Sequence, residues 1–390
     1  MIAVVGASAA GLTAAQTLRR EGYDGPLTVI GDEDSLPYDR PPLSKQILSG
    51  AWEPSKIALP CAVEGVEWML GVRATGLDVE SRRLTLSPGD DLAYDKLVIA
   101  TGVTPRRLPF GQELAGVHTL RTLPDTMAFK ADLASARSVV IVGAGFMGCE
   151  VAAVASGTGA DVTVVDPLPT PMNRQFGPWL GGLVARLHAD HGVRMRLGVG
   201  VTGLSGTSRV DGVELADGTV LPADTVLVAI GSVPNTDWLV GSGLSLTHGV
   251  DCDSLCRAAP NVAAAGDVAS WTHPVHGGRT RVEHRMNATE QGTAAARTLL
   301  GKGEPYAPIP YFWTDQYDVR IQAYGDFPAG AVPSLAAGDI RAGRFAAVYA
   351  SDGRITGVLG WKLPRDTRRL RARIGEVFDP LSPGDEWGRS

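Results

Sequence analysis

The chain has 390 residues, which at roughly 150 residues per domain is enough for two or three domains. Apolar residues make up 44% and charged residues 20%, so collagen-like, low-complexity and largely disordered classes are excluded. The net charge of −6 provides no general attraction to nucleic acid or anionic lipid, and no apolar run reaches the roughly 18 residues that span a bilayer. We therefore expect a globular protein that has neither nucleic acid nor a membrane as a partner.

The four cysteines are too few for a disulfide framework in a chain of this length, which indicates a reducing compartment, the cytoplasm. Cys252 and Cys256 are separated by three residues, a spacing that does not match a CxxC redox pair. Without a second pair of ligands, these two cysteines do not make a metal site either. We expect no bound metal.

A strand, a glycine turn and a helix are predicted at the start of the chain. The apolar run Ile2–Val5 leads into Gly6-Ala-Ser-Ala-Ala-Gly11, and a helical pattern follows from Leu12 to Arg20. Glycines let the backbone approach a diphosphate, and the N–H groups and dipole at a helix N-terminus favour its negative charge. This order of elements predicts a dinucleotide site, although Ser8 stands where the pattern has its second glycine.

The same order of elements recurs in the second quarter of the chain. Strand Ser138–Val142 leads into Gly143-Ala-Gly-Phe-Met-Gly148, and a helix-like run continues to Ser156. A single glycine turn also occurs where a strand and a helix merely pack closely, so either copy alone is weak evidence. Two copies in one chain make plain packing a poor explanation and predict two dinucleotide sites.

A second strand ending in acidic residues follows each turn. Strand Leu27–Ile30 precedes Asp32 and Glu33, and strand Asp161–Val165 precedes Asp166. The spacings from the first glycine are 32 − 6 = 26 and 166 − 143 = 23, close to the ~20 residues expected for a carboxylate that accepts ribose hydroxyls.

The duplication extends to the strands that close the two sheets. Leu97-Val-Ile-Ala-Thr-Gly-Val-Thr-Pro105 and Leu227-Val-Ala-Ile-Gly-Ser-Val-Pro234 share Ala, Gly and Pro at a constant offset (229 − 100 = 231 − 102 = 234 − 105 = 129). Each is a buried strand that leads into a glycine turn. The sequence therefore predicts an enzyme with two nucleotide cofactors.

Together these residues resemble the pyridine-nucleotide:flavin oxidoreductases with two dinucleotide domains. Three further stretches narrow the resemblance to the FAD-dependent, NADH-linked ferredoxin reductases that serve bacterial P450s and ring-hydroxylating dioxygenases. Leu36-Pro-Tyr-Asp-Arg-Pro-Pro-Leu-Ser-Lys45 is similar to their flavin-contacting loop, and Ala263-Ala-Ala-Gly-Asp-Val-Ala269 to their second FAD motif. Pro310-Tyr-Phe-Trp-Thr-Asp-Gln-Tyr317 is similar to the start of their C-terminal domain, where an aromatic residue flanks the flavin.

The resemblance covers nearly the whole chain and implies an α/β fold with two Rossmann-like dinucleotide-binding domains in the glutathione reductase-like arrangement. A small α+β C-terminal domain completes it. The FAD-binding domain would comprise residues 1–108 and 236–309, the NAD-binding domain 109–235, and the C-terminal domain 310–390. The last of these would be strand-rich at first, with a helical end at Arg365 to Glu376.

The resemblance also implies which residues bind the cofactors FAD and NADH (NAD+). The FAD contacts carried over are Gly6, Ser8, Ala10, Gly11, Asp32, Arg40, Pro41, Lys45, Ala74, Thr101, Gly102, Arg121, Asp267, Arg285 and Trp313. The NADH contacts are Gly143, Gly145, Phe146, Met147, Gly148, Glu150, Asp166 and Gly231. The family often has an aromatic residue where Arg285 stands. Because the flavin contact there is partly through the backbone, binding would survive this difference.

Two catalytic residues, Lys45 and Glu150, follow from the same resemblance. In this family a lysine at the position of Lys45 lies near flavin N5 and can pair with a glutamate at the position of Glu150. A positive charge there would favour the anionic reduced flavin. On their own, the two residues would be interpreted as a solvated loop lysine and an ordinary acid near a helix N-terminus.

The partner that the resemblance implies is a [2Fe–2S] ferredoxin. The segment Leu363–Ile374 carries five arginines against one aspartate in an otherwise acidic protein. Such a patch would steer an acidic ferredoxin, with Arg368, Arg369 and Arg373 as docking residues. A solvated helix face explains the same pattern equally well.

The function implied is transfer of a hydride from NADH to FAD and then of single electrons to a ferredoxin that feeds a P450 or Rieske-type oxygenase. The alternatives are an interaction flavoprotein similar to apoptosis-inducing factor and a reductase of another small acceptor, such as rubredoxin or quinone. Thiol-based relatives need a redox cysteine near position 40, where this chain has Pro42 and Ser44. Asp166 favours NADH over NADPH, although Arg174, eight positions on, keeps a 2′-phosphate contact open.

Overall fold

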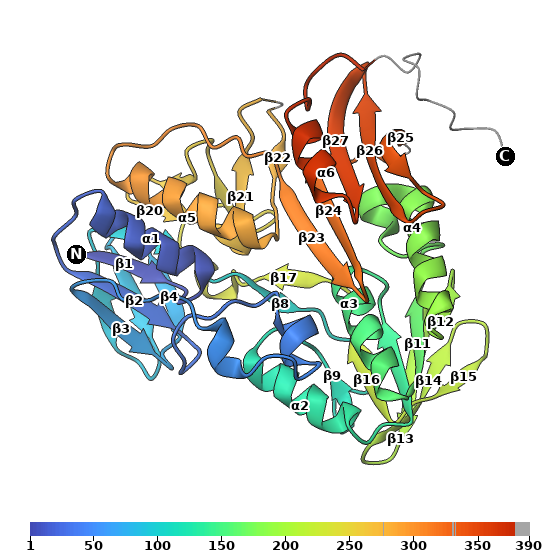
Figure 1. Cartoon of the computed structure of the whole chain (residues 1–390). Coiled ribbons are helices and arrows are strands. Elements are labelled where there is room, and N and C mark those ends of the chain that lie inside the picture. Colours follow the sequence, from blue (N-terminus) through green and yellow to red (C-terminus); the bar gives the residue numbers. More distant parts are fainter. Residues whose placement is uncertain (276, 330, 332, 379–390) are drawn as a thin grey trace. The chain divides into compact units, whose positions relative to one another are not determined.

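The structure is a computed structural model that describes residues 1–275, 277–329, 331 and 333–378 (Figure 1). The chain forms two compact units, each assembled from three stretches of sequence. Unit 1 comprises Met1–Asp39, Ser55–Thr104 and Ser232–Ile309. Unit 2 comprises Arg40–Pro54, Pro105–Gly231 and Pro310–Ser390.

Unit 1 is built on a six-stranded sheet, parallel except at one edge. In spatial order its strands are β19 (Arg257–Ala259), β20 (Val262–Ala264), β7 (Lys96–Ile99), β1 (Ile2–Val5), β2 (Leu27–Gly31) and β3 (Val66–Leu70). Every residue of β1 and β2 is buried, which is why these strands read as continuous apolar runs rather than alternating ones. The order matches the Rossmann type, with β1 in the interior of the sheet.

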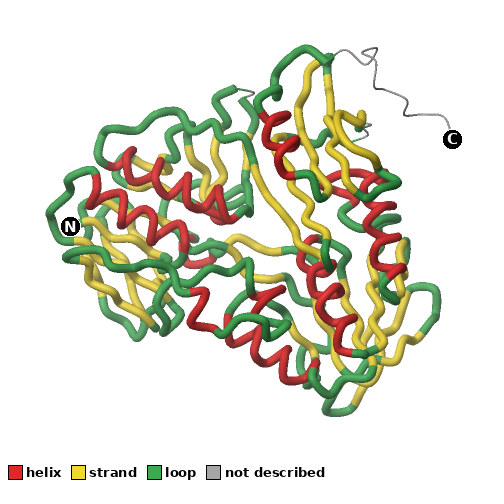
Figure 2. The backbone as a smooth tube through the Cα atoms, viewed as in Figure 1, coloured by secondary structure: helices red, strands yellow, loops and turns green. Residues whose placement is uncertain are grey.

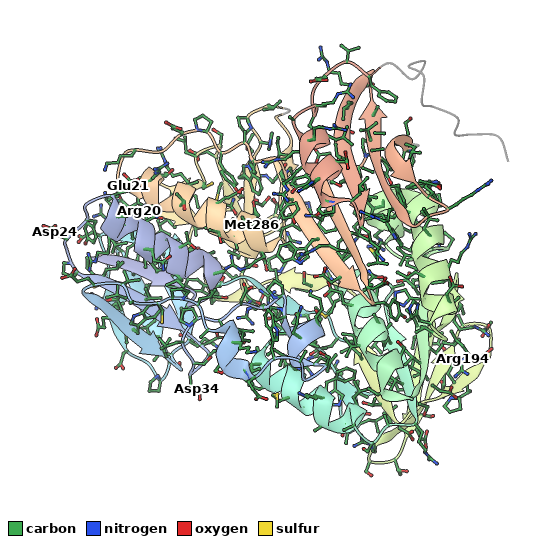
Figure 3. The ribbon with its side chains drawn as sticks, in the orientation of Figure 1. Arg20, Glu21, Asp24, Asp34, Arg194 and Met286 are labelled. Carbon is green, nitrogen blue, oxygen red and sulfur yellow. The ribbon has the colours of Figure 1, made fainter. Side chains whose placement is uncertain are left out.

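Helices α1 (Ala9–Arg20) and α5 (Arg285–Leu299) lie side by side in unit 1 (Figures 1 and 2). A Cβ on Gly292 would lie 2.5 Å from the Ala10 carbonyl oxygen, so glycine is what allows the two helices to approach so closely. Glu21, labelled in Figure 3 at the end of α1, accepts hydrogen bonds from Arg297 and Lys302.

Shorter elements complete unit 1. Antiparallel strands β4 (Ala74–Asp78), β5 (Arg83–Leu86) and β6 (Asp91–Ala93) form one sheet, β18 (Val250–Cys252), β21 (Ala269–Thr272) and β22 (Arg279–Thr280) form another, and β8 (Val103–Pro105) pairs with β17 (Ser232–Pro234). Single helical turns are η2 (Pro54–Ile57), η4 (Asp237–Leu239) and η5 (Gly266–Val268).

Unit 2 repeats the parallel sheet. In spatial order its strands are β12 (Arg194–Leu197), β11 (Asp161–Asp166), β10 (Ser138–Val142), β16 (Thr225–Val228) and β9 (Val117–His118). At its edge, Arg194, labelled in Figure 3, donates from Nε to Thr163 Oγ1 at 3.2 Å. The remaining elements are α2 (Leu123–Leu133), α3 (Phe146–Ala155), α4 (Asn173–Asp190), η1 (Leu43–Ile47), η3 (Ser156–Thr158) and the antiparallel strands β13 (Val201–Gly206), β14 (Val210–Leu215) and β15 (Val220–Pro222).

A five-stranded antiparallel sheet and one helix form the C-terminal part of unit 2. The sheet comprises β23 (Tyr311–Gln316), β24 (Val319–Gly325), β27 (Arg354–Trp361), β26 (Arg344–Ser351) and β25 (Ser334–Asp339). Helix α6 (Pro364–Arg371) ends earlier than the predicted Glu376. The chain turns back at Gly375, whose φ is +94° and whose N–H bonds to the Ile355 carbonyl oxygen of β27, so the helix cannot continue.

The predicted fold class is confirmed: two parallel, Rossmann-like layers and a small C-terminal domain of strands and one helix. The predicted boundaries of the three domains stay a prediction. Among the residues described, no helix has both the length and the apolar character needed to cross a bilayer.

Candidate functional site

The first glycine turn of unit 1 is held by backbone contacts that exclude any side chain. Gly6 has φ +119°, and a Cβ there would lie 2.1 Å from the Ala100 carbonyl oxygen at the end of β7. A Cβ on Gly11 would lie 1.9 Å from the Gly6 carbonyl oxygen. The end of β7 at Ala100 therefore lies directly against the turn, and helix α1 begins within the turn, at Ala9.

The second predicted FAD motif lies against this first turn. Gly266 of η5 has φ +77°, and a Cβ on it would lie 3.0 Å from the Ala10 Cβ. The Gly266 N–H donates to Gln291 Oε1 at 2.9 Å, which ties η5 to helix α5. The structure thus brings together two predicted FAD stretches, residues 6–11 and Asp267, from opposite ends of unit 1.

The other predicted FAD residues of unit 1 have defined partners. Arg285, the first residue of α5, pairs with Asp39 and donates from Nη1 to Thr289 Oγ1 at 2.5 Å. Asp32 follows β2 and pairs with Arg73 at 3.4 Å, and both of these side chains are exposed. Asp32 is therefore open to a ribose hydroxyl.

Thr101 and Gly102 form one linked segment with a residue that the sequence did not single out. Thr101 Oγ1 donates to the Asn235 carbonyl oxygen at 3.0 Å, and Asn235 Nδ2 donates to the Thr101 carbonyl oxygen at 2.8 Å. Gly102 has φ +67°, and its carbonyl oxygen accepts the Asn235 N–H at 3.0 Å. Its position just past the repeated Pro234 is the only sequence signal for Asn235. The remaining predicted residues here are Ser8, which precedes α1, and buried Ala74 on β4.

In the second glycine turn, in unit 2, close packing requires two of the glycines but not the third. A Cβ on Gly143 would lie 2.3 Å from the Ala229 carbonyl oxygen, and one on Gly148 would lie 1.9 Å from the Gly143 carbonyl oxygen. Around Gly145 no atom lies within 4 Å of such a Cβ, and its φ of −77° suits any residue. Gly145 therefore keeps open a space at the N-terminus of α3 that a diphosphate fits.

Asp166 contacts this turn directly. Its Oδ2 accepts the Ala144 N–H at 2.7 Å, and its Oδ1 accepts the Leu168 N–H at 2.8 Å. Each carboxylate oxygen has a second lone pair, so Asp166 can still accept ribose hydroxyls. Beside it, a hollow of about 530 Å³ at the carboxyl end of β12 is lined by residues 195–200, Ala216 and Asp217. Ligands bind outside the carboxyl ends of strands in such sheets.

The predicted ion pair is present and buried in unit 2. Lys45 Nζ lies 2.8 Å from Glu150 Oε2, and their side chains are only 10% and 8% exposed. Ser44 Oγ also donates to Oε2, while Thr314 Oγ1 donates to Oε1 at 2.9 Å. Burying a charged pair costs free energy unless further hydrogen bonds satisfy the oxygens, and the two hydroxyls provide them. Neither hydroxyl was identified from the sequence.

No thiol redox pair accompanies this ion pair. All four cysteines lie in the described part of the chain and are free, and Cys149, Cys252 and Cys256 are buried. Burial raises the pKa of Cys256 to about 12 and raises the pKa of Cys149 further, so both remain unreactive thiols at neutral pH. No group of three or more metal-ligating side chains occurs in the described ranges, so no candidate metal centre is present there.

The remaining predicted residues of unit 2 are held by backbone and aromatic contacts. Arg40 Nη1 donates to the Arg121 carbonyl oxygen at 2.7 Å. The half-buried Trp313 ring stacks on Tyr311 at 5.8 Å between centroids, and the Arg320 guanidinium lies 5.9 Å from the Trp313 centroid. The others are Pro41 before η1, Phe146 and Met147 in the first turn of α3, and Gly231 after β16 with φ +96°.

The arginine-rich C-terminal segment carries its charge on an exposed face. Thr367 and Leu370 of α6 are buried, whereas all five arginines of the segment are exposed. Arg369 pairs with Asp366 at 3.1 Å, and Arg373 pairs with Glu376 at 2.9 Å. Both alternatives, a solvated helix face and a docking patch, require arginines at the surface, and the docking role stays a prediction.

The chain belongs to the pyridine nucleotide-disulphide oxidoreductase family, whose model matches residues 1–292, and residues 311–380 match the reductase C-terminal model. The predicted cofactors, FAD and NAD(H), are confirmed by this membership. The chain is 36% identical over 389 residues to rhodocoxin reductase of Rhodococcus erythropolis, covering 98% of this chain and 91% of that protein. It is 37% identical over 392 residues to the ferredoxin reductase component of chlorobenzene dioxygenase of Cupriavidus sp. (strain PS12), covering 98% and 94%. The solved ferredoxin reductase for the CYP199A2 system from Rhodopseudomonas palustris superposes with a TM-score of 0.94 at 32% identity, covering 99% and 97%.

The open space at Gly145 gives a first prediction. In Gly145→Ala the added methyl meets no protein atom, so we expect wild-type thermal stability and FAD content but a rise in the Kd for NADH of about tenfold or more, because the methyl occupies the space for the diphosphate. Gly157→Ala, also free of contacts at its Cβ, is the control. Equal NADH affinity in both variants, measured by calorimetry, would contradict this use of Gly145.

Asp166 gives a second prediction. Asp166→Asn removes the charge that repels a 2′-phosphate, so the ratio of kcat/KM for NADH to that for NADPH should fall by about tenfold or more. The measurement is steady-state kinetics with both cofactors and a small artificial acceptor. A wild-type enzyme that already prefers NADPH would show that this assignment is wrong.

Proposed function

We propose that the protein is an NADH-dependent ferredoxin reductase that passes electrons from NADH through FAD, one at a time, to a [2Fe–2S] ferredoxin serving a P450 or Rieske-type oxygenase. The observation that carries the proposal is the buried ion pair between Lys45 of η1 and Glu150 of α3, in a chain whose four cysteines are all free. Two relatives support it, since one is named as the ferredoxin reductase component of a dioxygenase and the other as the ferredoxin reductase for the CYP199A2 system.

Bound FAD supplies the ability to accept a hydride and to release its electrons singly. The side chains supply binding and charge. The turn at Gly143–Gly148 presents backbone N–H groups to the NADH diphosphate, and Asp166 accepts ribose hydroxyls. The matching turn at Gly6–Gly11, with Asp32 and Asp267, holds FAD in unit 1.

Lys45 is the residue to which we assign the electrostatic step. Its ammonium has three N–H donors, and the bond to Glu150 uses one of them. The pairing fixes the position of a positive charge in a largely buried site, where it stabilises negative charge developing nearby more strongly than it would in water. Glu150 positions the lysine and is itself held by Ser44 and Thr314.

Thiol-dependent activities of the family do not fit this chain. Near position 40, where such relatives need a redox cysteine, it has Ser44, whose hydroxyl donates to Glu150. We place the protein in the cytoplasm, since four free cysteines in the described chain suit a reducing compartment. An interaction flavoprotein and a reductase of rubredoxin or quinone become outcomes of the following test.

The test is electron flow to cytochrome c. With NADH, the holoenzyme should reduce cytochrome c rapidly only when a [2Fe–2S] ferredoxin is added. Direct reduction of quinone or rubredoxin at higher kcat/KM would replace the ferredoxin in the proposal. A slow, long-lived complex with NADH and no turnover with any acceptor would contradict a reductase role.

The docking role of the arginine patch has its own test. Replacing Arg368, Arg369 and Arg373 by glutamine should lower kcat/KM for ferredoxin by about tenfold or more at low salt, because electrostatic steering is lost, and leave ferricyanide reduction unchanged. Replacing Arg20, Arg83 and Arg137, also exposed, removes the same charge elsewhere and serves as the control. Equal loss with both acceptors, or in both triple variants, would refute the patch.

A further inference from the structure

A chain of buried hydrogen bonds extends from Glu150 away from Lys45. Thr314 Oγ1 donates to Glu150 Oε1 at 2.9 Å, and Gln316 Nε2 lies 3.3 Å from Thr314 Oγ1. Gln316 Oε1 lies 3.0 Å from His188 Nε2, and His188 Nδ1 lies 3.0 Å from the Tyr317 hydroxyl. Thr314, Gln316 and His188 are all completely buried.

Every hydrogen bond in this series runs in the same direction, with the donor on the side of Tyr317 and the acceptor on the side of Glu150. Burial lowers the pKa of His188 to about 4, so the ring is neutral at pH 7 and has one N–H. Gln316 Oε1 can only accept, which places that N–H on Nε2 and makes Nδ1 the acceptor of the Tyr317 O–H. Gln316 Nε2 can only donate, so the Thr314 hydroxyl accepts from it and must turn its own proton to Glu150.

Local structure explains why these residues meet. Thr314 and Gln316 are two apart on β23 and therefore point to the same side of the strand. Tyr317 follows at φ +54°, which turns its ring to stack on His191 at 3.6 Å between centroids. The Thr-Asp-Gln-Tyr string thus supplies every member of the chain except His188 of α4 and Glu150 of α3.

The chain is suited to orientation rather than to conduction of protons. A proton can pass through a hydroxyl or an imidazole by exchange of its bonds, but an amide such as Gln316 would have to become its imidic acid form. Gln316 therefore interrupts any relay between Glu150 and Tyr317. Gln316 instead fixes the direction of the hydrogen bonds on either side of it, because neighbouring hydrogen bonds in a buried series reinforce one another.

We propose that Gln316 and His188 are positioning residues that fix the Thr314 hydroxyl as a donor to Glu150, and so hold the Glu150 carboxylate where it orients Lys45. The structural part of this proposal concerns only the series of hydrogen bonds from Tyr317 to Glu150. Its catalytic meaning rests on the proposed function, in which Lys45 acts on the flavin.

The decisive variant is Gln316→Glu, which keeps the shape of the side chain, although its carboxylate can only accept hydrogen bonds. The Thr314 hydroxyl then donates to the new carboxylate, and Glu150 loses one hydrogen-bond donor. With fewer hydrogen bonds to its oxygens, the Glu150 carboxylate offsets more of the positive charge of Lys45. We expect the midpoint potential of bound FAD to fall and kcat to fall about two- to tenfold, with the KM for NADH unchanged. Gln322→Glu, on neighbouring β24 and bonded to the Tyr311 hydroxyl, is the matched control and should change neither.

The tautomer of His188 in the wild-type protein is a second measurement, and it depends neither on the flavin nor on the folding of any variant. ¹⁵N NMR of the histidine rings in the wild-type protein at pH 7 should show His188 neutral with its proton on Nε2, and Gln316→Glu should make the ring doubly protonated. Thr314→Val should lower the potential as Gln316→Glu does, and Thr314→Ser should restore it in part.

The proposal is overturned if His188 carries its proton on Nδ1 in the wild type. It is also overturned if Gln316→Glu lowers only the melting temperature, leaving the potential and kcat where the control leaves them. Failure of the proposed function is distinguishable, because wild-type protein would then not reduce ferredoxin while the His188 tautomer stayed as expected.

Discussion

Close backbone contact at two glycine turns is the constraint on which the rest of the structure depends. Gly6 lies against the Ala100 carbonyl oxygen and Gly143 against the Ala229 carbonyl oxygen, and neither place has room for a Cβ. Each turn lies against the end of a neighbouring strand, and a helix begins within each turn, at Ala9 and at Phe146. The same kind of contact, between a glycine and the carbonyl oxygen of an alanine at a strand end, thus occurs in both parallel sheets. Two diphosphate sites in one chain are what we infer from it.

The second organising feature is a buried charge with a complete set of partners. Lys45 and Glu150 are both nearly inaccessible to solvent, a position that is unfavourable for an incompletely bonded pair. The hydroxyl groups of Ser44 and Thr314 donate to the two carboxylate oxygens of Glu150, so the buried pair has the further hydrogen bonds that it needs. Strand β23 therefore supplies a hydrogen bond to the charged pair as well as packing contacts.

The parts of the structure predictable from sequence are those that local pattern decides. Strands β1 and β10, their turns and the acids after β2 and β11 follow from apolar runs, glycines and spacing, and the structure has them within a few residues. The Lys45–Glu150 contact joins residues 105 positions apart and was reached only through resemblance. Thr314 and His188 were missed, because threonine in a strand and histidine in a helix give no signal until tertiary packing brings Thr314 to Glu150 and His188 to Gln316. The end of α6 was predicted too late, because its stop depends on the contact that Gly375 makes with β27.

The central claim is that one chain binds FAD and NADH on its two glycine turns and transfers electrons between them. Anaerobic titration of the purified protein with NADH, followed by its visible spectrum, tests this claim most directly. The account predicts a yellow protein whose flavin absorbance is bleached by about one equivalent of NADH per FAD, since each NADH delivers one hydride. Protein that stays colourless when supplied with FAD, or a flavin that NADH leaves oxidised, would contradict it.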